Sequence, residues 1–290
     1  MDPRLTIAIP IHAGARWIDG ILDTISKAPD WSRIVISDGT HRDDAADRLA
    51  ELCRDDDRVE VVSRPGTLDW IQNANLLLEE AATEYFCWMP QDDLVAPDSY
   101  FELLVDALDH NPGRVLAFPT VSRKMKVGWW RNRSLGEVAY RSPPFELGCA
   151  PPEEEALRML KEWNPALGCW RGVFRTREAR PAPSTNDSAD LIWAFSMALA
   201  GNFIEVGQAR YLKRFHRGSA LRSMRWQGRS KAMGLYRVEV EARLGPDSAA
   251  VERVMSEVGG FLYRHRVNMA LYPMIRAGSV ALNRPRPVLE

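Results

Sequence analysis

Residues 85–94 read YFCWMPQDDL, and this stretch decides the fold that we expect. Its apolar half is typical of a strand buried on both faces, and the apolar run stops at Pro90. Gln91, Asp92 and Asp93 follow at once. Two adjacent carboxylates at a strand end allow two interpretations: a hydrated surface turn, in which Asp is common, or a site for a hard divalent cation such as Mg²⁺ or Mn²⁺.

Strands and helices alternate around this stretch. Apolar runs predict strands at 5–11, 33–37, 59–63, 85–89 and 115–121. Helical spacing predicts helices between them, with Thr67 as the N-cap of the third, Asn75 on its buried face and Pro97 in the first turn of the fourth. This order indicates right-handed βαβ units and a mostly parallel, Rossmann-like sheet flanked by helices.

Polar residues follow several of these strands. His12, Asp38 and the Gln91–Asp93 group all come at carboxyl ends. In open parallel sheets, ligands bind outside these ends. The sequence therefore predicts one binding rim.

The alternation breaks after residue 122. Residues 123–151 predict a long loop or irregular ribbon, which in compact domains is usually functional or disordered. A helix at 152–163, a strand at 171–175, a helix capped by Asp187 or Ser188 and a strand at 208–214 follow. Asp190 falls in the first turn of the second helix, where a carboxylate also stabilises the helix dipole. Residues 220–290 predict two or three amphipathic helices.

Composition excludes several classes of protein. With 38 basic and 39 acidic residues, the net charge is −1, so no global basic field points to nucleic acid. No signal-peptide layout is found, and the longest apolar segment is too short to span a bilayer. Cys53, Cys87, Cys149 and Cys169 are widely spaced, which favours reduced thiols and a cytoplasmic location.

Four ordered blocks resemble the family 2 glycosyltransferases, which are inverting enzymes with a GT-A fold. The blocks are LTIAIPIHA with Pro10, IVISDGT with Asp38, the PQDD tetrad preceded by Asn75 and Glu84-Tyr85, and a final block. That block contains Asp190, Gly201, Arg214, His216 and Ser219. The resemblance covers roughly residues 4–219.

The resemblance implies a role for each matching residue. Asp92 would hold Mn²⁺ or Mg²⁺ on the donor diphosphate, with His216 as a further metal or phosphate contact, and Asp190 would be the general base. His12 would stack on the base, and Asp38 would accept its imide proton. The expected donor-binding residues are Pro10, His12, Asp38, Asn75, Gln91 and Asp93.

Three departures from the family pattern keep an alternative open. Pro90 stands where the first Asp of the tetrad is expected, Ser37 replaces an Asp and Ala189 replaces a Glu. The alternative is a degenerate, catalytically inactive nucleotide-sugar-binding or assembly module. A dinucleotide oxidoreductase is disfavoured, because PIHAGARW follows the first strand in place of a GxGxxG fingerprint.

The resemblance also implies an organisation and partners. Residues 1–122 would bind the donor, residues 123–219 would bind the acceptor within the same domain, and residues 220–290 would form a helical appendage. The expected donor is a UDP- or dTDP-sugar, and the acceptor is a saccharide, a lipid-linked or a small molecule, as in polysaccharide biosynthesis. The basic helices leave open peripheral contact with the inner face of the membrane or a homodimer surface.

Overall fold

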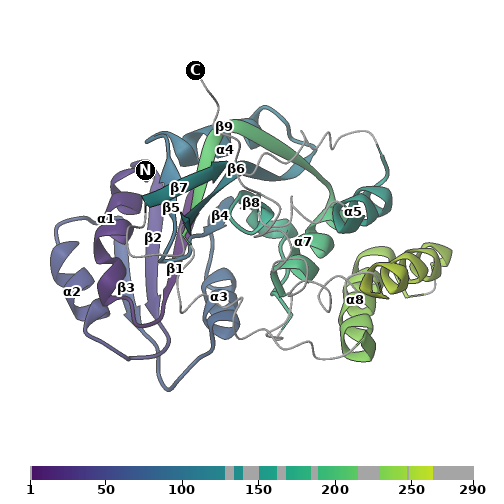
Figure 1. Ribbon diagram of the computed structural model, residues 1–290, viewed down its shortest axis with the longest axis horizontal. Helices are drawn as coiled ribbons and strands as arrows, with labels where there is room; N and C mark the ends of the chain where they lie inside the picture. Colours follow the sequence, from purple (N-terminus) through teal and green to yellow (C-terminus); the bar gives the residue numbers. More distant parts are fainter. Residues whose placement is uncertain are drawn as a thin grey trace. The chain divides into compact units, whose positions relative to one another are not determined.

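The computed structural model describes residues 2–127, 134–139, 150–161, 168–183, 189–214, 229–246 and 248–263 (Figure 1). The chain divides into two compact units, Met1–Trp226 and Gln227–Glu290. Each unit is described by itself below. The boundaries expected after residues 122 and 219 stay predictions.

One sheet organises the first unit. Among the described residues its strand order is β3-β2-β1-β4-β8-β6-β9-β5, with β7 paired to β6. The strands are β1 Leu5–Ile11, β2 Ser32–Asp38, β3 Val59–Ser63, β4 Tyr85–Trp88, β5 Leu94–Ala96, β6 Arg114–Val127, β7 Ser134–Ala139, β8 Val173–Arg175 and β9 Asn202–Arg214. β1 runs parallel to β2 and β4, and β2 runs parallel to β3. The mostly parallel sheet predicted from the sequence is therefore confirmed.

Helices cover both faces of this sheet. On one face lie α1 Ile18–Ser26, which follows a 3-10 turn at Ala15–Trp17, together with α2 Ala45–Leu52 and α4 Tyr100–Asp109. On the other face lie α3 Trp70–Glu79 and α7 Ala189–Ala200, which both contact Trp88. α5 Pro152–Lys161 contacts α7. Figure 1 shows α1 and α2 on one side of β1–β3 and α3 on the other. This is the layered α/β architecture that the alternation predicts.

An aromatic cluster fixes α7 against the sheet. The rings of Trp88 and Trp170 stack at 4.2 Å, and Trp193 of α7 meets both edge-on at 4.9 and 5.2 Å. Phe174 of β8 packs against Trp193 at 4.9 Å. Such ring pairs contribute beyond their buried area. Because this packing surrounds α7, the start of the helix is held beside the sheet.

Two glycines permit close approach of the backbone in this region. A Cβ on Gly172 would lie 2.2 Å from the Ala117 carbonyl oxygen, next to the pairing of β6 with β8. A Cβ on Gly201 would lie 2.5 Å from Val115. Only glycine fits these positions without movement of the neighbours.

Three local predictions are wrong. The N-cap of α3 is Asp69 and not Thr67: its side chain accepts from the amides of Ile71 and Gln72, and Gln72 completes a capping box. Asn73 and not Asn75 is the fully buried polar residue of α3, because Asn73 is the one that faces the sheet, where it bonds Ser37. Pro97 precedes α4, which begins at Tyr100.

The second half also contains more strand than predicted. β5 directly after Asp93 was not expected, and β9 starts at Asn202 rather than at Gln208. β6 and β7 pair antiparallel at the start of the stretch 123–151. The pairing runs from Ser122 opposite Ala139 to Val127 opposite Ser134. The ribbon interpretation is therefore confirmed for this part. Asp187 and Ser188 lie outside the described residues.

The second unit contains α8 Arg229–Leu244 and a helix over residues 249–263. Gly245, with φ of +83°, makes the left-handed turn that ends α8. Arg237 pairs with Glu252 of the following helix at 2.8 Å. No helix within the described ranges is long and apolar enough to cross a membrane. Cys53, Cys87 and Cys169 are buried free thiols, as expected, and Cys149 lies outside the description.

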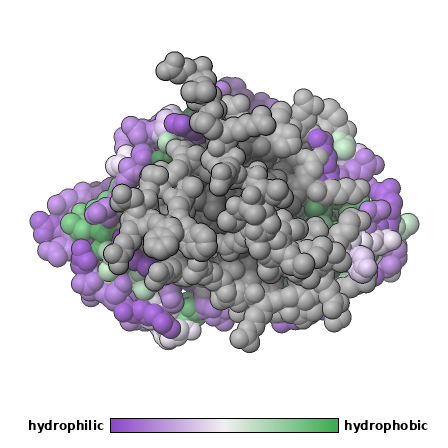
Figure 2. Space-filling view, viewed as in Figure 1, coloured by the Kyte–Doolittle hydropathy of each residue, from purple (hydrophilic) through white to green (hydrophobic). Residues whose placement is uncertain are grey.

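Around the rim of the face drawn in Figure 2, the coloured surface is mainly hydrophilic, with small apolar areas. Few large apolar side chains of the described residues are exposed: Leu52, Trp70, Val238 and Tyr263. The apolar residues of the sheet lie in the core, as the buried strand runs predict.

Candidate active site

The turn from β4 to β5 places the two adjacent carboxylates differently. Asp93 is 3% exposed and Asp92 is partly exposed. Asp93 Oδ2 accepts a short hydrogen bond from the Tyr211 hydroxyl, and Oδ1 accepts from the Arg214 amide at 2.8 Å. Burial raises the pKa of Asp93, and the Arg171 guanidinium, with its Nε 3.9 Å from Oδ2, opposes this rise. Asp93 therefore anchors the turn to β9.

Gln91 ties the same turn to the end of β1. Its Oε1 accepts from the His12 amide at 3.0 Å, and its Nε2 donates to the His12 carbonyl at 2.8 Å. Ala13 beside them has a φ of +48°. The side chain of Gln91 thus holds the backbone of His12, and the two expected donor-binding residues are brought together.

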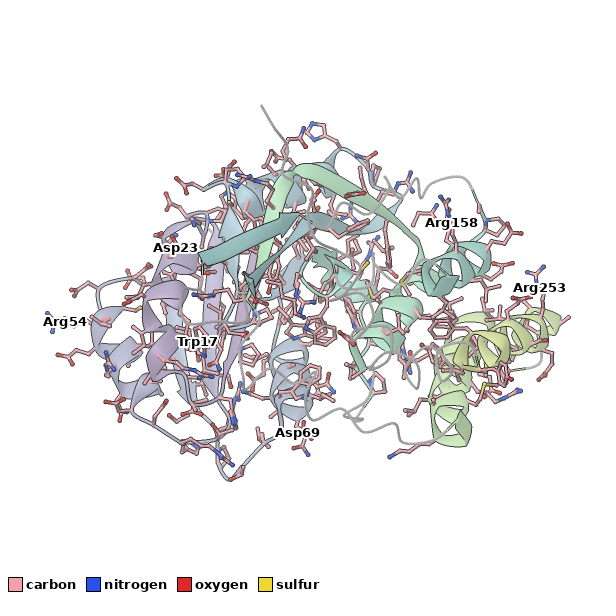
Figure 3. All side chains as sticks on the ribbon, viewed as in Figure 1. Trp17, Asp23, Arg54, Asp69, Arg158 and Arg253 are labelled. Atoms are coloured by element: carbon pink, nitrogen blue, oxygen red, sulfur yellow. The ribbon has the colours of Figure 1, made fainter. Side chains whose placement is uncertain are left out.

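Arg214 joins this turn to α1. Its Nε donates to the Asp92 carbonyl at 2.6 Å, and its guanidinium lies 4.9 Å from the centre of the Trp17 ring. A groove of about 550 Å³ runs along this side, lined among others by Asp19, Asp23 and Arg214. Figure 3 labels Trp17 and Asp23. Because side chains alternate along a strand, Arg214 lies on the opposite face of β9 from Tyr211, whose hydroxyl bonds Asp93.

A cluster of charges surrounds the other side of the turn. Burial lowers the pKa of Lys213 to about 8, and Arg171 adds to the lowering, whereas Asp93, Asp190 and Asp92 act in the opposite direction. Burial also disfavours the Arg171 cation, but Tyr211, Asp93 and Asp190 outweigh it and raise its pKa. Asp92 from the β4–β5 turn and Asp190 from α7 therefore share the electrostatic environment of the same lysine.

The end of β2 forms a second polar centre. Asp38 is 3% exposed, and its Oδ1 accepts from the amides of Thr40 and His41 at 2.8 and 3.0 Å. Next to it, Ser37 donates to Asn73 Oδ1 at 2.6 Å and Asn73 donates back to the Ser37 carbonyl at 2.9 Å. α3 therefore fixes the strand end that presents Asp38.

Asn75 has a different neighbour. Its Nδ2 donates to the Ala182 carbonyl at 2.9 Å, and its Oδ1 accepts from the Ala182 amide at 2.8 Å. The side chain thus holds the segment before α7 against α3. Its expected role in donor binding stays a prediction.

The structure brings most of the expected site residues to one end of the sheet. Pro10, His12, Asp38, Gln91, Asp92 and Asp93 lie at or just after the ends of β1, β2 and β4. Asp190 lies in the first turn of α7, and its carboxylate accepts from the Leu191 amide at 2.9 Å. His216 lies outside the described residues.

The expected cation would depend on few protein ligands. Within the part of the chain that the structure describes, no group of three or more His, Cys, Asp or Glu side chains is arranged to hold a metal ion. Asp92 supplies a hard carboxylate ligand, and one or two carboxylates suffice where substrate phosphates complete the coordination. The chemistry of Asp92 therefore fits Mn²⁺ or Mg²⁺ bound together with a diphosphate.

The sequence did not predict that Arg171, Tyr211 and Lys213 belong to the site. Arg171 is a charged residue with 6% exposure next to β8. Tyr211 and Lys213 share one face of β9, just before the expected Arg-x-His motif. The predicted strand that contains Lys213, QARYLKR, also contains Arg210 and Arg214, so no local signal distinguishes this lysine.

The fold and this rim, a mostly parallel sheet with carboxylates at its carboxyl end, are those expected of GT-A glycosyltransferases. The sequence profile described as glycosyl transferase family 2 matches residues 6–169. The chain belongs to this family, and the resemblance stated above is confirmed. No curated protein sequence matched the chain.

Solved structures with the same fold include TarS of S. aureus. Its residues 1–349 in complex with UDP-GlcNAc give a TM-score of 0.65 at 17% identity, over 91% of this chain and 72% of that chain. The same TarS fragment in complex with UDP gives a TM-score of 0.60 at 16% identity, with the same coverage. At such identities the likeness is one of fold.

Proposed function

We propose that this protein is an inverting glycosyltransferase that moves a sugar from a nucleoside-diphosphate donor to an acceptor hydroxyl. The observation that carries the proposal is the placement of Asp38 and Asp92 at or just after the ends of β2 and β4, at one edge of the sheet. Membership of the family supports glycosyl transfer. The UDP-sugar and UDP bound to TarS support a UDP-sugar as donor, with a dTDP-sugar as the second choice.

Asp38 and His12 would hold the nucleoside. Asp38 is fixed by its own turn, and an ionised carboxylate can accept the imide proton of uracil or thymine. The backbone of His12 is held by Gln91, and its ring would stack on the base. Asp92, with His216, would hold Mn²⁺ or Mg²⁺, whose charge would stabilise the leaving diphosphate.

Asp190 would act as the general base. As the acceptor oxygen attacks the anomeric carbon, its proton passes to the Asp190 carboxylate. Attack from the face opposite the leaving group inverts the anomeric configuration, so an α-linked donor gives a β-linked product. The packing of Trp193 of α7 against Trp88 and Trp170 supports this role, because it holds the helix that carries Asp190 beside the sheet.

The acceptor would bind on the side formed by residues 123–219, which includes the β6–β7 ribbon. The acceptor would be a saccharide, a lipid-linked molecule or a small molecule. Cytoplasmic location, contact with a membrane surface and a homodimer also stay predictions.

The variant Asp190→Asn tests the role of Asp190 as general base. This change keeps the size of the side chain and removes its basicity. We expect a loss of transfer of about 10²–10⁴-fold with donor affinity retained, measured as product formation and as calorimetric binding of UDP with Mn²⁺. Transfer at the wild-type rate would refute the role of Asp190.

A catalytically inactive nucleotide-sugar-binding or assembly module is the second candidate. It is favoured by Pro90 and by Ala189, which is buried where the family pattern has a Glu. The variant Asp92→Ala separates the two candidates: an enzyme loses Mn²⁺-dependent binding of the diphosphate, whereas a module binds without metal and is unaffected.

A further inference from the structure

The inference concerns Lys213, whose position follows from the alternation of β9. Side chains of a strand point alternately to its two faces. Tyr211, whose hydroxyl bonds Asp93, shares its face with Lys213. Arg210, Leu212 and Arg214 alternate with Tyr211 and Lys213 along the strand, and their side chains therefore belong to its other face. Lys213 therefore points to the side of the sheet on which Asp93 and Arg171 lie.

The charges around Lys213 come from three separate segments. Asp92 and Asp93 belong to the β4–β5 turn, Asp190 to α7 and Arg171 to the segment before β8, and all four act on its ammonium group. Arg171 already faces Asp93 at 3.9 Å, and its guanidinium lies 5.2 Å from the centre of the Tyr211 ring. A second cation beside Arg171 is unfavourable for folding, and such locally unfavourable arrangements are characteristic of functional sites.

In the proposed reaction, the ammonium group of Lys213 has a substrate group to bind. The donor diphosphate would lie at Asp92 and the acceptor hydroxyl at Asp190, so the bond that breaks lies between these two carboxylates. Lys213 lies next to the carboxyl end of β9, on the face of Tyr211, whose hydroxyl bonds Asp93 in the same turn as Asp92. We propose that Lys213 binds the β-phosphate of the donor and stabilises the charge that this phosphate gains as it leaves.

This inference rests on the proposed function and adds one group to its chemistry. An electron pair of the acceptor oxygen forms the new bond to the anomeric carbon, and the pair of the old carbon–oxygen bond leaves with the diphosphate. The acceptor proton goes to Asp190. The ammonium group of Lys213 keeps its protons and contributes electrostatic stabilisation, which is strong in a partly desolvated site.

The experiment compares Lys213→Met, Lys213→Arg and Arg210→Met. Met keeps most of the volume of the lysine side chain without its charge, and Arg keeps the charge. Arg210 lies on the same strand, on the opposite face and exposed, and is the matched control. Calorimetry with uridine, UMP and UDP, each with and without Mn²⁺, measures the contribution of each phosphate. GDP and dTDP are included for the case of another base.

We expect Lys213→Met to weaken UDP binding at least about tenfold, the size of one lost hydrogen bond to a charged group, with UMP and uridine unchanged. Lys213→Arg should recover part of the loss, and Arg210→Met should bind as the wild type does. Equal weakening of all three ligands would indicate a structural role and overturn the inference, as would unchanged UDP binding. If the wild-type protein binds no nucleoside diphosphate, the proposed function itself fails.

Discussion

The two carboxylates of the β4–β5 turn have different tasks because their surroundings differ. Asp93 is buried, and both of its oxygens are bonded to β9. Asp92 is partly exposed, and its carbonyl is held by Arg214. The bonds made by Asp93 and Arg214 thus fix the backbone that presents Asp92. In this respect the turn is preorganised for a ligand, which reduces the cost of binding.

The variant Tyr211→Phe tests this anchoring. It removes the hydroxyl that donates to the buried Asp93 carboxylate, and the loss of a hydrogen bond to a charged group costs about 1.5–3 kcal/mol. We expect the free energy of unfolding in urea to fall by that amount. Tyr263→Phe is the control, because Tyr263 is 61% exposed, and it should change nothing. Unfolding of Tyr211→Phe at the wild-type midpoint would contradict the anchoring role.

At the residue scale, the sequence predicted the positions of the polar groups better than their partners. Asp38, Gln91 and Asp92 lie at strand ends as predicted, since an apolar run followed by a polar group is visible in one dimension. That Gln91 bonds the His12 backbone, 79 residues away, could not be predicted. Such pairs depend on the register between strands, which no local pattern encodes.

At the element scale, α3 holds the end of β2 in place through hydrogen bonds. Its N-terminus is fixed by the Asp69–Gln72 capping box, and Asp69 is labelled at the end of the helix in Figure 3. One turn later, Asn73 bonds both the hydroxyl and the carbonyl of Ser37. Fraying of the first turn would therefore loosen the strand end that presents Asp38.

The variant Asp69→Ala should destabilise the protein by about 0.5–2 kcal/mol, the usual cost of losing an N-cap. Thermal unfolding measures the change. Thr67→Ala is the matched control: Thr67 is exposed and lies two residues before the true cap, so it should unfold as the wild type does. A larger effect of Thr67→Ala than of Asp69→Ala would show that the cap is misassigned.

The wrong prediction of Thr67 as the N-cap of α3 has a physical reason. Thr67 and Asp69 are both good N-cap residues, and propensity alone does not choose between them. The glutamine three residues after Asp69 completes a reciprocal box, and that spacing was the overlooked signal. β5 was missed for a different reason. It has three residues and exists only because β9 pairs with it.

At the scale of the whole molecule, the alternation of strands and helices sufficed to predict a mostly parallel sheet. It did not reveal that β8 enters antiparallel between β4 and β6. This insertion depends on Gly172, where the backbones approach too closely for any side chain. A single glycine in a sequence is too common to signal such an approach.

Stability against acid should depend on three carboxylates held by arginines. Arg58, Arg64 and Arg4, respectively, lower the pKa of Asp56, Glu80 and Asp109 through hydrogen bonds. The ordinary pKa values are 3.8 for Asp and 4.5 for Glu. A lowered pKa in the folded state stabilises the protein above the unfolded pKa, and this stability is lost as the pH falls through the folded value.

The triple variant Asp56→Asn, Glu80→Gln, Asp109→Asn measures this contribution. Because the pairs are partly exposed, we expect a loss of about 0.2–1 kcal/mol for each at pH 7 and pH 5, with the difference from the wild type shrinking below about pH 4. Urea unfolding at several pH values provides the measurement. Asp55→Asn, at an exposed carboxylate, is the control. A difference that grows toward low pH would contradict the assignment.

The alternation of β9 has a practical consequence for anyone who wishes to redesign this protein. Positions 211 and 213 share one face of the strand, on which Tyr211 bonds Asp93, whereas positions 210, 212 and 214 share the other face. A mutational library restricted to positions 211 and 213 would change the face that carries the proposed phosphate contact, and one restricted to positions 210 and 212 would change the opposite face. Arg214 belongs to neither library, because its side chain also holds the carbonyl of Asp92.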